Sequence, residues 1–199
     1  WGWCSSVDSD PWLTGYALFG LAQARELGYP ARASVLENAA NYLVAQLVTP
    51  SPQVTAFEVN RQAFFLYVLA QLDAGIVPDL DRLVEENRSL LDPYARALVA
   101  LAYADLSVTD DRVTTLLNDL NDSAVVSATG THWQDASHDI RNLNSDVRGT
   151  AVVLQTLAQL DPENPLLLSP ALGDLARNGL DHLLADGVDG GQRRAGCQL

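Results

Sequence analysis

Apolar residues recur three and four positions apart along most of this chain, which is the spacing of one face of an α-helix. Leu and Ala dominate these stretches and runs of β-branched residues are scarce, so the pattern predicts an all-helical fold. Four segments are apolar over most of their circumference, and we expect the helices they form to be largely buried. They read PWLTGYALFGLAQAREL, NRQAFFLYVLAQLDAG, DPYARALVALAYADL and DVRGTAVVLQTLAQLDP.

The ends of these four segments carry recognisable start and stop signals. An Asp-Pro pair places a capping carboxylate before a proline that fits the first turn, and a glycine favours the end of a helix. The expected starts are Asp10-Pro11, about Asn60, Asp92-Pro93, and Ser145 or Asp146, and the expected ends include Gly28 and Gly75.

Amphipathic segments separate the four apolar ones, each with one apolar stripe and one polar face. They read VLENAANYLVAQL, DLDRLVEENRSLL, DDRVTTLLNDL and PALGDLARNGLDHLL. Buried and half-buried helices therefore alternate at an irregular repeat of roughly 35–50 residues, as in arrays of helix pairs. An open solenoid and a closed double ring of helical hairpins both fit this alternation. We favour the ring, because it buries its inner helices on both sides.

One stretch, residues 124–145, breaks the helical pattern. Its valines precede Thr129-Gly130 and are followed by Trp133, which predicts a short hairpin or an ordered loop. Its polar and aromatic composition marks it as a candidate functional rim. Four of its side chains are of types that bind metal or transfer protons: His132, Asp135, His138 and Asp139. We expect these side chains to be solvated or to cap the next helix, because all lie on one stretch and no further His or Cys pattern supports them.

Composition narrows the class of protein. The 199 residues fit one domain, and nearly half of them are hydrophobic. The net charge of −13 and the pI of about 4.3 argue against nucleic acid and anionic membrane surfaces as partners. No apolar run approaches the roughly 20 residues that span a bilayer.

The chain begins with Trp1 and contains no methionine, so we interpret it as a fragment. All twelve basic residues are arginine, which together with abundant Ala, Gly, Leu and Asp indicates a GC-rich genome. A ring that lacks its first and last helices would expose apolar inner helices. We therefore expect poor solubility or dimerisation of this chain alone.

The remaining candidates for chemistry have simpler explanations. Cys4 and Cys197 are too few for a disulfide framework, and Cys4 has no histidine nearby to activate it. Asp8 and Asp10 could act as paired carboxylates, but capping of a helix explains them. Large aromatic residues at helical spacing usually lie in a core rather than a ligand site; here they are Trp1, Trp3, Trp12 and Trp133. We assign no catalytic residue, cofactor or metal ligand.

Two motifs carry a resemblance to a known family. The first is Trp1-Gly2-Trp3 followed by PWLTGY and then AQAR at residues 22–25; the second is GTHW at 130–133 followed by VRGTAVVLQTLAQLDPENPLL. Together they resemble the thioester-containing domain of the α2-macroglobulin and complement family, in its bacterial branch. The resemblance covers residues 1 to about 178 and implies an α/α toroid, here incomplete at both ends.

The resemblance implies an endopeptidase inhibitor rather than an enzyme. In the family, cleavage of a bait region lets a large protein close around the attacking protease, and a Cys–Gln thioester in this domain links to it. The implied partners are target proteases and other domains of the same chain. The implied location is the periplasm, the cell envelope or the extracellular space.

The chain departs from the family pattern in its site residues. The Cys-Gly-Glu-Gln motif lies upstream of the PWLT helix in the family, and the 199 residues do not contain it. No histidine stands near SPQVTAFEVN, where the family's helper histidine would fall. Some bacterial members trap proteases without a thioester, so both kinds of trap stay open.

Residues 179–199 differ from the Trp and TQxTAW sequence with which the family continues. Reading GC-rich codons for Leu180 to Gly190 from the second base gives a string of Trp, Thr and Gln that is similar to it. We therefore expect residues 179–199 to be a frameshifted, non-native tail, which would leave His182 and Cys197 without a function. The codons of the gene test this expectation.

Two alternatives from other classes remain. One is an enzyme on a helical ring, a glycosidase or a terpene cyclase, although the Asp8 pair departs from the acidic motif of class II terpene cyclases. Three or more carboxylates facing one pocket would favour this alternative. The other is a helical-repeat scaffold for protein partners, which an elongated particle in solution scattering would favour.

Overall fold

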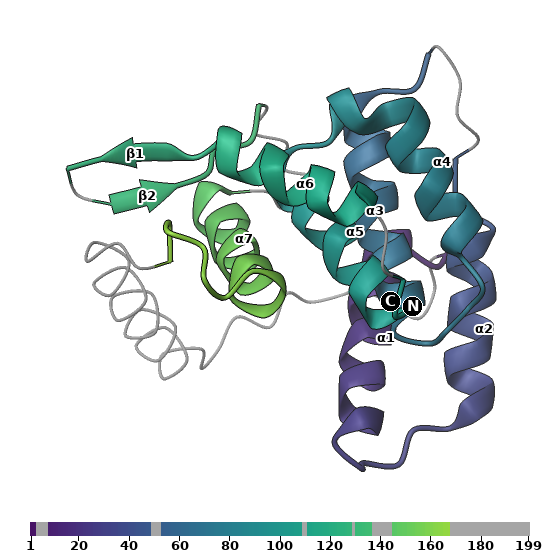
Figure 1. The fold of residues 1–199 in the computed structure, drawn as a ribbon. Helices are drawn as coiled ribbons and strands as arrows, with labels where there is room; N and C mark the ends of the chain where they lie inside the picture. The colour runs from purple at the N-terminus through teal and green to yellow at the C-terminus, as the bar shows by residue number, and fades with distance from the viewer. Residues whose placement is uncertain (3–7, 49–52, 109–110, 129, 137–144, 168–199) are drawn as a thin grey trace, which may run out of the picture.

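The computed structural model describes residues 1–2, 8–48, 53–108, 111–128, 130–136 and 145–167. Within these ranges the chain forms seven α-helices, a short 3₁₀-helix and a two-stranded hairpin (Figure 1). The elements are α1 (Pro11–Glu26), α2 (Ala33–Val44), α3 (Ala56–Ala70), α4 (Val77–Asn87), η1 (Arg88–Leu90), α5 (Pro93–Asp105), α6 (Asp111–Asp122), β1 (Val125–Ser127), β2 (Gly130–His132) and α7 (Asp146–Leu160). The prediction of an all-helical fold with a short hairpin is confirmed.

The odd-numbered helices correspond to the four apolar segments, and the even-numbered helices to the amphipathic ones. The odd-numbered helices pack in chain order, α1 on α3, α3 on α5 and α5 on α7. Each even-numbered helix packs on the odd-numbered helix before it. The fourth amphipathic segment, at 170–184, lies outside the described residues.

Local signals place most helix starts correctly. The Asp10 carboxylate accepts a hydrogen bond from Leu13 N at 2.9 Å, and the Ser145 hydroxyl accepts from Arg148 N at 3.2 Å. Helix α1 ends before Gly28, whose φ of +84° is a left-handed conformation that suits glycine.

One expected helix start and one expected helix cap are wrong. Helix α3 begins at Ala56 rather than about Asn60, because Thr55 and Glu58 form a capping box that starts it earlier. Asp92 stands at the start of α5, but its side chain does not cap that helix. Its carboxylate bonds to groups outside α5 instead, as described below.

The expectation that all four apolar helices are largely buried holds for two of them. Eleven of the fifteen residues of α3 and ten of the thirteen of α5 are buried. Only four of sixteen in α1 and five of fifteen in α7 are buried, so the expectation is wrong for these two helices. The reason is their position: α3 and α5 each pack between two other odd-numbered helices, whereas α1 and α7 each pack extensively on only one.

The hairpin interrupts the helices at the predicted place. Strand β1 pairs antiparallel with β2 so that Val126 lies opposite Thr131, and the hairpin projects from the helices beside α7 (Figure 1). Its outer strand is exposed, whereas Gly130 and Thr131 of β2 are buried. Trp133, directly after β2, is 1% exposed and packs with a second, smaller core of Ala97, Leu120, Val153 and Leu157.

Candidate functional site

A buried polar contact joins α3 and α5 near their starts. Asn60 Nδ2 of α3 donates a hydrogen bond to Asp92 Oδ2 over 2.8 Å, and Asp92 N donates to Asn60 Oδ1 over 2.9 Å. The other carboxylate oxygen of Asp92 accepts from Ala136 N at 3.2 Å. Burial raises the pKa of Asp92, opposed by the bond from Ala136 and the charge of Arg96. One carboxylate therefore fixes α3, α5 and the segment after the hairpin together.

Trp133 anchors that segment from the other side. Its backbone N–H donates to the Thr150 hydroxyl of α7 at 3.0 Å, and this hydroxyl donates to the Trp133 carbonyl at 3.3 Å. The indole Nε1–H donates to the Leu120 carbonyl of α6 at 2.7 Å. Trp133 is thus a buried anchor with a satisfied polar group, as expected for a core tryptophan.

Aromatic side chains from α1 and α3 pack against one another. The Trp12 and Phe64 rings stack with their centroids 5.1 Å apart. The centroid of the Tyr16 ring lies 4.8 Å from that of the Phe64 ring. Gly15 allows the approach, because a Cβ at that position would stand 2.8 Å from Phe64 Cε1. Tyr16 also accepts a hydrogen bond from Arg148 Nη1 of α7 at 2.9 Å.

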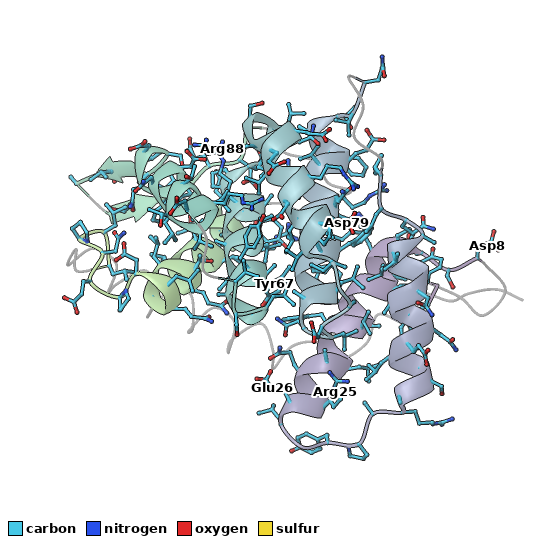
Figure 2. The ribbon with its side chains drawn as sticks, turned by 45° about the vertical axis from the view of Figure 1, so that its right-hand side comes forward. Asp8, Arg25, Glu26, Tyr67, Asp79 and Arg88 are labelled. Carbon is cyan, nitrogen blue, oxygen red and sulfur yellow. The ribbon has the colours of Figure 1, made fainter. Side chains whose placement is uncertain are left out.

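The opposite ends of α1, α3 and α5 surround a cavity of about 400 Å³. Three carboxylates, one arginine and one amide belong to its lining, and Figure 2 shows Arg25 and Glu26 at this end of α1. The lining residues are Ala22, Arg25, Glu26, Ala70, Gln71, Leu72, Asp73 and Asp105. Sequence reasoning missed this cavity.

A chain of side-chain hydrogen bonds crosses the three helices beside the cavity. Gln23 donates to Gln71, and Gln71 donates to Asp105. Burial, and secondly the charge of Glu26, raise the pKa of Asp105. Burial also raises the pKa of Tyr67, with smaller contributions from Asp105 and Glu26. Of the cavity's carboxyl groups, Asp105 therefore protonates more readily than an aspartate in water.

A signal for these residues is present in the sequence. The four apolar segments end in AQARE, AQLD, AYAD and AQLD, so an acidic side chain recurs after the last apolar turn of each. Parallel neighbouring helices bring such equivalent positions to one end of the array. Reading the apolar stripes alone overlooked this repeat.

The candidate cluster in the hairpin region is only partly described. His132 Nε2 lies 3.1 Å from Gln134 Nε2, whereas Asp135 is 8% exposed and is therefore not solvated. Its burial follows from packing on α7, where Asp135 Oδ1 is 3.6 Å from the position of a Cβ on Gly149. The alternative expectation, that Asp135 caps the next helix, stays a prediction. His138 and Asp139 lie outside the described residues. Within the described ranges, no three His, Cys, Asp or Glu side chains group as metal ligands.

The other candidates from the sequence fall into three groups. Asp10 caps α1, as predicted, and Asp8 is exposed. Trp133 is a buried core residue and Trp12 packs, partly buried, against the main core, whereas Trp1 is 43% exposed. The positions outside the described residues are Trp3, Cys4, His182 and Cys197. None of the described helices is long and apolar enough to cross a membrane.

Comparisons with known proteins identify the fold. No family model matches the sequence, and no curated protein matches it significantly. A crystal structure of Salmonella α2-macroglobulin reacted with methylamine matches 90% of this chain with a TM-score of 0.67 and 21% identity. A cryo-EM reconstruction of native Escherichia coli α2-macroglobulin matches 88% with a TM-score of 0.65 and 17% identity.

The match is to a small part of each of those proteins. This chain covers 11% of both of them, and 27% of a shorter native Escherichia coli structure that runs from domain MG7 to the C-terminus. That third match has a TM-score of 0.62 and 18% identity over 85% of this chain. At this level of identity the likeness concerns the fold: the chain folds like a helical segment of bacterial α2-macroglobulins.

Proposed function

We propose that this chain is part of the thioester-type helical domain of a bacterial α2-macroglobulin, a protease inhibitor that traps its target. The observation that carries the proposal is the fold likeness to Salmonella α2-macroglobulin over 90% of the chain. The resemblance of the PWLT and GTHW motifs to that domain also supports it. The first motif begins α1, and the second contains the buried anchor Trp133. The domain assignment, residues 1–178, stays part of the proposal.

The proposed role belongs to a larger protein. A protease cleaves a bait region elsewhere in that protein, and the protein then closes around it. The partners of this domain are the protease and the neighbouring domains of the same polypeptide, in the periplasm or at the cell envelope. In this role we assign the helical domain no catalytic group.

The contact between Tyr16 and Arg148 supports a ring rather than an open solenoid. In a solenoid each repeat touches only its neighbours, so α1 and α7 would lie far apart. Instead, a hydrogen bond of 2.9 Å joins them across a sequence separation of 132 residues. We infer that the odd-numbered helices follow a closed curve, and solution scattering of this chain should give a compact particle.

A protease challenge of the complete parent protein tests the proposed function. The coding DNA on both sides of this segment gives the parent chain, and its codons also test the frameshift expected at 179–199. Trypsin should convert the purified parent into a faster-sedimenting form that holds the trypsin. The held trypsin should cleave small substrates but not large ones. Trypsin with its active-site serine blocked is the matched control. A parent that is cleaved without retaining trypsin contradicts the proposal.

The same experiment distinguishes two kinds of trap. A Cys-Gly-Glu-Gln motif upstream, with uptake of labelled methylamine, indicates a covalent trap. Retention of trypsin that denaturant reverses, without methylamine uptake, indicates a non-covalent one.

An enzyme is the second candidate, because three carboxylates line one cavity. Glu26, Asp73 and Asp105 meet the condition that favours a glycosidase, and the raised pKa of Asp105 suits a general acid. The polar lining does not suit a terpene cyclase, which needs an apolar pocket. Hydrolysis of a glycoside by this chain, lost in Asp105→Asn but retained in Asp79→Asn, would establish the enzyme.

A further inference from the structure

Arg148 lies where the starts of three odd-numbered helices meet. Its Nη1 donates to the Tyr16 hydroxyl of α1 at 2.9 Å, and its guanidinium carbon stands 4.0 Å from the centre of the Tyr94 ring of α5. Tyr16 in turn packs on Phe64 of α3. One side chain of α7 therefore touches α1 and α5 and reaches α3 through one ring.

Arg148 has no ion pair among the described residues, although the carboxylate of Asp135 lies near the neighbouring Gly149. Arg148 stands in the first turn of α7, over a residue in the first turn of α5, and helix starts carry partial positive charge that repels a cation. Among the described residues no carboxylate pairs with it, and its buried Nε has no acceptor. Its contacts are a neutral phenol and an aromatic face, which bind a guanidinium less tightly than a carboxylate does.

We propose that Arg148 is a reversible latch that holds α1 against α7. The latch closes through the bond to Tyr16 and the contact with Tyr94, and it opens because the unpaired Nε and the helix starts oppose it. The bond between α3 and α5 at Asn60 and Asp92 does not depend on it, so opening moves α1 while the middle of the array keeps its geometry. The proposal concerns the motion of this chain and stands apart from the proposed inhibitor function.

Distance measurements between spin labels test the latch directly. The labels are placed at Gly20→Cys on α1 and Gln155→Cys on α7, both exposed, in the 199-residue chain with Cys4 and Cys197 changed to serine. Tyr16→Phe removes only the hydroxyl and keeps the ring against Phe64. We expect a longer and broader distance distribution in Tyr16→Phe and in Arg148→Gln. The double variant should show no further change, because both single variants break the same contact.

Amide exchange gives a second readout. Amides in the first half of α1 should exchange at least about tenfold faster in Tyr16→Phe, the lower end of the ratio that corresponds to one lost hydrogen bond to a charged group. Amides in the middle of α5 should keep their rates. Arg148→Lys keeps the charge over Tyr94, and we expect it to lie between wild type and Arg148→Gln.

Tyr103→Phe is the matched control, because it also removes a tyrosine hydroxyl bond, the one to Asp81 at 2.9 Å between α5 and α4. It should lower stability and leave the α1–α7 distance unchanged. The latch is overturned if Tyr16→Phe keeps the wild-type distance distribution and α1 exchange rates. It is also overturned if Tyr103→Phe changes the α1–α7 distance as much as Tyr16→Phe does, since the change would then follow from lost stability alone.

Discussion

Helices α3 and α5 and helices α1 and α7 have similar sequences but different surroundings. The middle pair buries most of its residues, whereas α7 exposes Val147 to 79% and also Ala151 and Ala158, which lie on one face at helical spacing. The amount of apolar sequence therefore does not decide how deeply a helix is buried. The number of neighbouring helices decides it. Self-association through such a face, expected from the sequence, stays a prediction.

Replacing matched leucines in α3 and α7 should give the largest contrast. Leu69 of α3 is completely buried, whereas Leu154 of α7 is only partly buried. Leu69→Ala should lower the free energy of unfolding by about 2–5 kcal/mol, the range for a cavity in a close-packed core. Leu154→Ala should lower the free energy of unfolding by clearly less, because its site is open to solvent on one side. Urea unfolding followed by circular dichroism measures both, and equal losses would break the comparison.

The buried contact between Asn60 and Asp92 should show the next largest effects. Asp92→Asn places two amide N–H groups face to face. It should lower the free energy of unfolding by about 1–3 kcal/mol, the penalty of a buried polar group without a partner. Asn60→Asp places two carboxylates face to face and should cost at least as much. Thermal unfolding at neutral pH measures both.

The exchanged pair Asn60→Asp with Asp92→Asn restores every donor and acceptor. The carboxylate at 60 then accepts from the backbone and amide of residue 92, and the amide oxygen at 92 accepts from Ala136 N. Its stability should return close to that of the wild type. A double variant as unstable as the sum of the single variants would show that the contact is not the one the geometry describes.

Much of the fold follows from local rules, and the exceptions have one cause. Periodicity places all seven described helices, and the break in periodicity places the hairpin near Trp133. The sequence could not show that the Asp92 carboxylate bonds to α3 and to the segment after the hairpin rather than capping its own helix. That choice depends on Asn60, which is 32 residues away and comes within reach only after the helices pack.

The candidate site was less predictable for the same reason. The cavity forms where Glu26 and Asp105 meet from separate helices, while the sequence drew attention to His132 and Asp135, which are close along the chain. Arg148 carried no signal at all, because an arginine in the first turn of a helix is ordinary until Tyr16 is placed beside it. Residues brought together by helix packing need the packing to be known.

Two glycines of α1 sharpen the contrast between its buried and exposed faces. Gly15→Ala would bring a Cβ within 2.8 Å of the Phe64 ring, which cannot move freely because it stacks on Trp12. We expect the free energy of unfolding to fall by about 1–3 kcal/mol, as for overpacking of a core. Gly20 is exposed, and a Cβ added there would have no heavy atom within 4 Å, so Gly20→Ala should gain up to about 1 kcal/mol from helix propensity. Shifts of opposite sign in the melting temperature are expected, and a gain in both would show that α1 lies farther from α3.

The ion pair between η1 and α6 should show the smallest effect, because it lies at the surface. Arg88 Nε donates to Asp119 Oδ2 at 2.7 Å and Nη2 bonds the other oxygen, but the Arg88 side chain is 45% exposed. Arg88→Gln should cost roughly 0.2–1 kcal/mol at neutral pH and less in molar salt. The bonds from Arg88 lower the pKa of Asp119 below its ordinary value of 3.8. The pair therefore stabilises the folded chain above that pH, and this stabilisation disappears as the pH falls through the lowered pKa. Wild type and Arg88→Gln should therefore become equally stable in acid. A difference that persists there would assign the effect to packing of the arginine stem rather than to charge.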